Sequence, residues 1–232
     1  MNRLIRRLVR HHLPVGAATV AWGWYLYTTR SFPDVLTRLS FSSAYPALAL
    51  LAATLVIGPI KLLVGNRIAA SIDLRRDVGI WAGVTALFHT AVGQCVHLRG
   101  RPWLYYIYEN WPQKHLFPVR HDLFGLANYA GLGAALFLLA LLATSNDASL
   151  RAVGMPSWKK LQRWNYAIFG LAAVHTITYQ VGIEKPQAAF IANAVALVMI
   201  SLVLQWRGYQ HKRALTVLRR VDAAQQPGNV RL

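Results

Sequence analysis

The sequence predicts an all-α integral membrane protein in which six transmembrane helices form one bundle and both termini are cytoplasmic. Hydrophobic residues make up 55% of the 232 residues and charged residues only 14%, whereas a soluble domain normally carries about a quarter charged residues. The apolar residues form six runs, each of about the length that crosses a hydrocarbon layer of roughly 30 Å. Lys and Arg cluster between these runs, which predicts how the helices are oriented.

The net charge of +17 does not indicate a nucleic-acid partner. A DNA-binding domain gathers its basic residues on one soluble face, whereas here they lie in short clusters between apolar runs. The single cysteine, Cys95, excludes an internal disulfide and a thiolate metal site. The sequence contains no nucleotide-binding βαβ pattern, no Cys-x-x-Cys pair and no glycine-rich phosphate loop. We therefore expect this chain to lie in a membrane and to bind no nucleic acid.

The first apolar run spans Leu13 to Thr29 and follows a basic segment. A signal peptide has the same order of charged and apolar regions. The run holds two Trp and two Tyr between residues 22 and 27 and lacks a small-x-small cleavage site, so an uncleaved helix is favoured. We expect a basic cytoplasmic N-terminus over 1–10, a transmembrane domain over 11–207 and a basic cytoplasmic tail over 208–232.

The next two runs are Ala44 to Val64 and Val78 to Leu98. The first of them contains Gly58-Pro59, and we expect a kink there because proline removes a backbone hydrogen bond. The other contains no Asp, Glu, Lys or Arg. It leads into residues 99–121, which are dense in Trp, Tyr, Pro and basic residues and predict a loop in the lipid headgroup zone.

The last three runs are Leu123 to Thr144, Tyr166 to Ile183 and Ala188 to Trp206. Residues 145–160 predict a short polar loop between the fourth and fifth helices. With the N-terminus inside, inner segments hold 18 Lys and Arg and outer segments hold seven, which are Arg30, Arg38, Arg99, Arg101, Lys114, Arg120 and Lys185. This positive-inside bias predicts cytoplasmic termini, and it explains most of the net charge because basic loops attract anionic headgroups.

Two histidines lie deep inside apolar runs. His89 follows Asp77 by 12 residues and His175 follows Arg163 by 12 residues, and both charged residues mark the inner edges of their helices. Both rings are therefore expected about 18 Å along helices that run in the same direction. Ionisable groups at this depth are costly and indicate function. Two imidazoles at one level suit the two axial positions of a haem iron, so His89 and His175 are the predicted cofactor and metal ligands.

A structural role is the alternative for each histidine, since a lone imidazole in a membrane helix often hydrogen-bonds to its neighbour. The matched depth favours the ligand interpretation for the pair. His97 lies eight residues, about two helical turns, beyond His89, where an interfacial role is favoured over binding a haem propionate. Arg99 and Arg101 are candidates for pairing with propionates or with lipid headgroups.

Two segments resemble the ferric-reductase-like transmembrane family. LRRDVGIWAGVTALFH resembles its third helix, and the stretch from Asn128 to His175 resembles its fourth and fifth helices, with an Ala-Thr-Ser ending, a Val-Gly turn and a Trp-x-x-Leu entry. The nearest subgroup is the haem-binding membrane subunit of the periplasmic methionine-sulfoxide reductase system. The resemblance covers roughly Leu74 to Gln180. It implies that His89 and His175 ligate b-type haem and that the protein lies in the bacterial inner (plasma) membrane.

The chain departs from the family at two positions. Family members often continue Trp-x-x-Leu with His, where this chain has Gln162, and a second, inner haem would need a ligand on the third helix, where Arg76 stands. We therefore expect one haem b. An inner carrier, FMN or a quinone, is a further expectation near Arg75, Arg76 and Gln162.

The predicted function is transfer of single electrons across the membrane, from a separate cytoplasmic flavin reductase or quinol to an outer acceptor protein or small molecule. The chain shows no NAD(P)H or flavin domain, so it is predicted to be an oxidoreductase subunit rather than a complete enzyme. The alternative is a non-redox membrane protein, a small transporter or an assembly scaffold, in which both histidines are structural.

Overall fold

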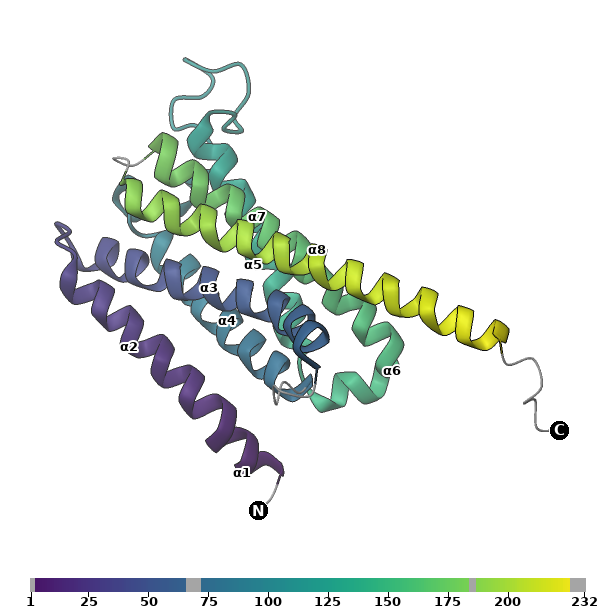
Figure 1. Cartoon of the computed structure of the whole chain (residues 1–232). Helices are drawn as coiled ribbons and strands as arrows, with labels where there is room; N and C mark the ends of the chain where they lie inside the picture. The colour runs from purple at the N-terminus through teal and green to yellow at the C-terminus, as the bar shows by residue number, and fades with distance from the viewer. Residues whose placement is uncertain (1–2, 66–71, 184–186, 226–232) are drawn as a thin grey trace.

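The computed structural model describes residues 3–65, 72–183 and 187–225. Nearly all of these residues are helical, and the long helices lie side by side (Figure 1). Arg67, Lys185 and Arg231, which the orientation prediction used, lie outside the described residues, as do the side chains of Arg3, Arg99, Arg219 and Arg220.

The chain begins with α1 (Arg3–Arg7) and a π-helical turn, η1 (Leu8–His12), which continue into α2 (Leu13–Thr29). Two long helices follow, α3 (Val35–Val64) and α4 (Ile72–Gly93), and then two 3-10 turns, η3 (Leu98–Gly100) and η4 (Pro102–Tyr105). The second half contains α5 (Leu123–Ala143), α6 (Asp147–Leu161), η5 (Gln162–Trp164), α7 (Asn165–Thr178), the π-helical turn η6 (Tyr179–Ile183) and α8 (Ala188–Gln225).

Four helical segments in the described part of the chain are long and apolar enough to cross a membrane: Val35–Val64, Leu123–Ala143, Asp147–Ile183 and Ala188–Leu218. The other two predicted spans are shorter. The helix α2 has 17 residues, and the part of α4 after its last charged residue, Asp77, ends at Gly93. Both are below the ~20 residues that cross a bilayer without thinning it. Both pack along α3 nevertheless.

Four predicted boundaries were wrong. The third predicted helix, Val78 to Leu98, is α4, which begins at Ile72 and ends at Gly93. Most of the predicted polar loop at 145–160 belongs to α6 (Asp147–Leu161), which has a kink at Gly154 (φ +75°); Asn146 caps its start by accepting from the Ser149 amide, and the Trp158 indole donates to the Thr144 carbonyl. The helix α3 begins nine residues before its apolar run, at an N-cap formed by Asp34. The sixth helix does not end at Trp206; α8 continues to Gln225 and projects past the other helices (Figure 1).

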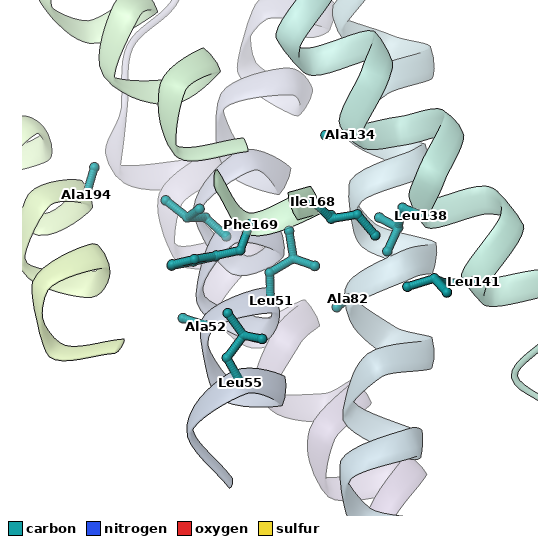
Figure 2. Close-up of a cluster of buried hydrophobic side chains, with 11 residues drawn as sticks. Leu51, Ala52, Leu55, Ala82, Ala134, Leu138, Leu141, Ile168, Phe169 and Ala194 are labelled. Atoms are coloured by element: carbon teal, nitrogen blue, oxygen red, sulfur yellow. The ribbon is translucent and has the colours of Figure 1, made fainter. Parts of the chain in front are cut away.

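The main core lies where α3, α4, α5, α7 and α8 meet, and Figure 2 shows its labelled side chains. It consists of small and aliphatic residues, with one aromatic ring, Phe169. Small residues let membrane helices approach closely, which substitutes for the hydrophobic drive that lipid does not supply. This core therefore fixes the relative positions of the helices that carry the predicted ligands.

Helix α8 is locked onto α3 at Pro59. Proline has no amide hydrogen, so the carbonyl of Leu55 has no helical donor four residues later. The Gln205 amide of α8 donates to that carbonyl, and a Cβ at Gly208 would lie 2.9 Å from the Pro59 Cβ. The Gln205 side chain thus replaces the missing helical donor, and the absence of a side chain at Gly208 lets α8 approach Pro59 closely enough for this bond.

The N-terminal segment is locked onto α4 at Asp77, whose side chain is fully buried. Arg7 donates to this carboxylate through its Nε at 3.2 Å and through a second guanidinium nitrogen. The His11 Nδ1 lies 2.7 Å and the His12 Nε2 lies 3.3 Å from the same carboxylate. His11 and His12 are consecutive residues of the π-helical turn η1, and both contact the Asp77 carboxylate.

Candidate cofactor site

The structure brings the two predicted ligands together. His89 comes from α4 and His175 from α7, and their ring centroids lie 6.2 Å apart with 72° between the ring planes. Both rings line one cavity between α3, α4, α5 and α7. The equal spacing from charged residues to histidines in the two helices therefore predicted a real proximity.

Each imidazole is oriented by a backbone carbonyl. The Nδ1 of His89 lies 2.9 Å from the Ser40 carbonyl oxygen in α3, and the Nδ1 of His175 lies 2.9 Å from the Ala127 carbonyl oxygen in α5. A carbonyl only accepts, so each Nδ1 carries the proton and donates. Nε2 is left as the unprotonated nitrogen of each ring, which is the form that binds a metal, and a carbonyl is a common second partner of such a ligand.

Gly131 of α5 makes room for the His175 ring. A Cβ at this position would lie 2.7 Å from Nδ1 and 3.0 Å from Cε1 of His175, closer than real Cβ contacts. Gly133, on the same helix, has only ordinary space around it, with Leu171 at 3.6 Å. Among the glycines of the fourth run, Gly131 is therefore the one that the site requires.

The cavity is polar at one end and apolar at the other. We call the end of the bundle where α4 ends and α5 begins the connection end. Here the lining includes Thr37, Gln94, His97 and Gln180, while deeper in the bundle it includes only aliphatic side chains such as Leu51, Leu138 and Ile168. Its volume is about 160 Å³.

A second pair of histidines shows that spacing alone does not make a site. The rings of His115 and His121, in the loop between η4 and α5, have centroids 6.4 Å apart. His115 stacks on Tyr108 at 3.5 Å, His121 is exposed, and neither lines the cavity. The Nδ1 of His121 lies 3.4 Å from the Val119 carbonyl oxygen, so what this pair lacks is enclosure in the cavity.

The basic residues predicted as candidates have other partners. Arg101 pairs with Glu109 on the surface of the loop, and the side chain of Arg99 is not described. Arg76 is buried and donates to Asp147 at the start of α6. Gln162 lies in η5, where its side-chain oxygen accepts from Asn165 at 3.4 Å. None of these residues lines the cavity.

Sequence reasoning missed the place of His97 and Tyr179. The prediction put His97 near the face of His89 but at the interface, whereas α4 ends at Gly93 and the turn that follows brings His97 to the cavity. The Tyr179 ring contacts both His175 and His97, with centroid distances of 4.8 Å and 6.4 Å. Its hydroxyl donates to the Asn128 side-chain oxygen. The sequence signal that could have indicated a polar end of the cavity was one amide residue in each of three otherwise apolar segments: Gln94, Asn128 and Gln180.

Comparison with known proteins gives partial relatives. Over 87 residues, 38% of this chain, the sequence is 34% identical to the magnetosome protein MamZ of Magnetospirillum gryphiswaldense, of which the match covers 13%. Over 81 residues, 35% of this chain, it is 31% identical to MsrQ of Polaromonas naphthalenivorans, the heme-binding subunit of protein-methionine-sulfoxide reductase, of which the match covers 35%. No protein-family profile and no solved structure matches.

The chain thus spans about an eighth and about a third of the length of these two relatives. The likeness to MsrQ supports the family resemblance carried by the third to fifth helices. Taken with the four helices in the described part of the chain that are long and apolar enough to cross a bilayer, it supports an integral membrane protein.

Proposed function

We propose that this chain is a membrane haem protein that passes single electrons across the bilayer, and that His89 and His175 are the residues that would hold one b-type haem. One observation carries the proposal. Two imidazoles from different helices, each with its Nδ1 bonded to a carbonyl, meet inside one cavity. Hydrogen bonds of this kind fix the tautomer and ring orientation of a metal ligand.

The two rings lie close enough together to hold one metal ion between them, because their centroids are 6.2 Å apart. His89 and His175 would supply imidazole nitrogens to that ion, and the aliphatic side chains that line the rest of the cavity would surround an apolar cofactor.

The haem would supply a one-electron carrier, and the chain supplies its ligation and surroundings. His89 and His175 hold the iron, Ser40 and Ala127 orient them, and the aliphatic lining excludes water. In this proposal six helices cross the membrane, with α2 and α4 joining the four longest, and both termini are cytoplasmic. Electrons come from a cytoplasmic flavin reductase or a quinol and leave to an outer acceptor, as expected of an oxidoreductase subunit in a bacterial inner membrane.

The visible spectrum of protein purified with ample haem tests the proposal. We expect a haem-to-protein ratio near one, a spectrum typical of two imidazole ligands and a shift on reduction. His89→Ala and His175→Ala should each abolish that spectrum. The matched control is the double variant His115→Ala/His121→Ala, which removes the other close imidazole pair and should leave the spectrum unchanged. A stable, colourless wild-type protein would instead favour the scaffold or transporter alternative.

The lone cysteine tests the orientation. Cys95 is exposed in the turn after α4, at the connection end of the bundle. A membrane-impermeant maleimide added outside intact cells should label it, because the proposal places this end outside. A Cys95→Ser/Ser149→Cys variant carries the label site at the start of α6, at the opposite end of the bundle, and should be labelled only after lysis. The reverse result would invert the proposed topology.

A further inference from the structure

His97 is a third imidazole in the cavity, and its backbone is held in place. The His97 amide donates to the Tyr105 hydroxyl at 2.8 Å, and that hydroxyl donates to the Gly93 carbonyl at 2.9 Å. Tyr105 is almost fully buried at the base of the loop. The turn after α4 therefore presents His97 at one position rather than leaving it free at the surface.

The His97 ring is packed between aromatic rings. It stacks on Tyr179, with 20° between the planes, and contacts Phe124 edge-on at 6.0 Å and Tyr105 at 6.2 Å. Neither ring nitrogen of His97 has a hydrogen-bond partner among the described residues. An imidazole fixed in orientation, half-buried and lining a cavity has the features of a group that binds a ligand.

Because polar residues line only the connection end of the cavity, the polar part of a bound ligand is expected at that end, beside His97. A b-type haem is apolar on most of its edge and carries two carboxylates on one side. Those carboxylates cannot be placed among Leu51, Leu138 and Ile168 without losing their hydration, and removing an ion from water is unfavourable unless a partner compensates it. At the connection end, His97 offers an imidazole donor, and Gln94 has a second amide hydrogen besides the one it donates to Tyr106, whereas the Thr37 hydroxyl already donates to Asp34.

We propose that His97 binds a carboxylate of the cofactor at the connection end of the cavity, and so sets its orientation and couples its reduction to proton uptake. This inference rests on the proposed function. It makes His97 a positioning residue, not an axial ligand. It also assigns the carboxylate contact to an imidazole in place of Arg101, whose guanidinium is already paired with Glu109.

The charges around His97 favour this role. Burial lowers the pKa of His97, and the carboxylate of Asp34 at the start of α3 opposes that effect. Asp34 itself is held by the Thr37 amide and hydroxyl. Of the other neighbours, Tyr105 is neutral because burial raises its pKa, and Arg120 lies over the Phe124 ring at 4.9 Å. A second carboxylate beside the ring would stabilise the imidazolium further.

Reduction of the site would be accompanied by uptake of one proton. When one electron enters the site from the donor, the neutral fraction of His97 takes up one proton from water, so one negative and one positive charge enter together. No bond between heavy atoms forms or breaks. The reduction potential should then fall as pH rises through the His97 titration, by at most about 59 mV per pH unit, the value for a tenfold change in a one-electron equilibrium.

The test measures haem affinity and the pH dependence of the potential by spectroelectrochemistry on purified, loaded protein. His97→Ala should weaken haem binding by about 10- to 100-fold, as loss of a second partner typically does. His97→Gln keeps a hydrogen-bond donor without titrating, so it should retain haem and lose the pH slope. His121→Ala, which removes an exposed imidazole outside the cavity, should match the wild type in both measurements.

The outcomes separate the two proposals. A wild-type protein that binds no haem refutes the proposed function and this inference together. A wild-type protein with a normal bis-imidazole spectrum, whose His97 variants keep both affinity and pH slope, refutes only the inference. If His97→Ala is poorly folded by circular dichroism, the pH slope of His97→Gln still decides, and a slope equal to the wild type overturns the coupling.

Discussion

One added methyl group should damage the candidate site. In Gly131→Ala the new Cβ would lie 2.7 Å from Nδ1, 3.0 Å from Cε1 and 3.2 Å from Cγ of His175. The ring has to move by roughly 0.7 Å to restore an ordinary contact, and overpacking of this kind costs about 1–3 kcal/mol. Moving it also disrupts the bond to the Ala127 carbonyl, a further loss of about 0.5–1.5 kcal/mol.

The sum of these terms, about 1.5–4.5 kcal/mol, predicts a haem affinity weakened by roughly 10- to 2,000-fold. The assay is titration of haem-free protein with haem, followed by absorbance, together with a far-ultraviolet circular dichroism spectrum to show that the helices remain. Gly133→Ala is the matched control, because its Cβ meets only Leu171 at 3.6 Å. Its affinity should stay within about threefold of the wild type, a margin of ~0.6 kcal/mol. Wild-type affinity in Gly131→Ala, or equal losses in both variants, would refute the placement of His175 against α5.

Three predictions concern the rest of the fold, each checked by thermal unfolding in detergent. Asp77→Leu leaves the half-buried Arg7 without its carboxylate and should cost about 3–5 kcal/mol, whereas the double variant Arg7→Met/Asp77→Leu should recover much of the loss; equal losses would contradict the ion pair. Gln205→Leu should cost about 1–3 kcal/mol by leaving the Leu55 carbonyl without a donor, and should cost less in a Pro59→Ala background, where the amide of residue 59 is restored. Arg120 lowers the pKa of Asp122, so this carboxylate stabilises the fold above about pH 4 and loses its effect as pH falls through the lower folded-state value; the destabilisation by Asp122→Ala should therefore shrink on acidification.

The parts of the fold that depend on chain length and local chemistry were predictable from sequence. The run Leu13 to Thr29 is α2 with the same bounds, and α5 ends one residue before its predicted run. Apolar length determines both because a helix that crosses a bilayer needs an uninterrupted apolar stretch. An equal depth of His89 and His175 was expected for a related reason, since each follows a charged residue, Asp77 or Arg163, by 12 residues and the rise per helical residue is constant. Their rings do lie close together, which equal depth alone does not require.

Contacts between residues far apart in the sequence were not predictable in the same way. The bond from Gln205 to Leu55 joins residues 150 apart, and the three side chains around Asp77, those of Arg7, His11 and His12, lie 65 to 70 residues away from it. A glutamine in an apolar run and an acid at a helix start indicate that a partner exists without indicating which one. Likewise, residues 145–160 are polar enough for a loop, and only the Asn146 cap and the Trp158 bond to Thr144 show why they form a helix.

If the proposed haem is bound, the same contacts favour one haem per chain. A second haem nearer the N-terminal end would need ligands near Arg76 of α4 and Gln162 of η5, the positions that differ from the resembled family. Arg76 donates to Asp147 and lies 3.6 Å from Asp73, and this pairing joins α4 to the first turn of α6. A guanidinium has no lone pair to give a metal, and the Gln162 amide is not a haem ligand. In the proposed function, electrons entering from that end would therefore have to reach His89 and His175 from a carrier outside the four-helix cavity.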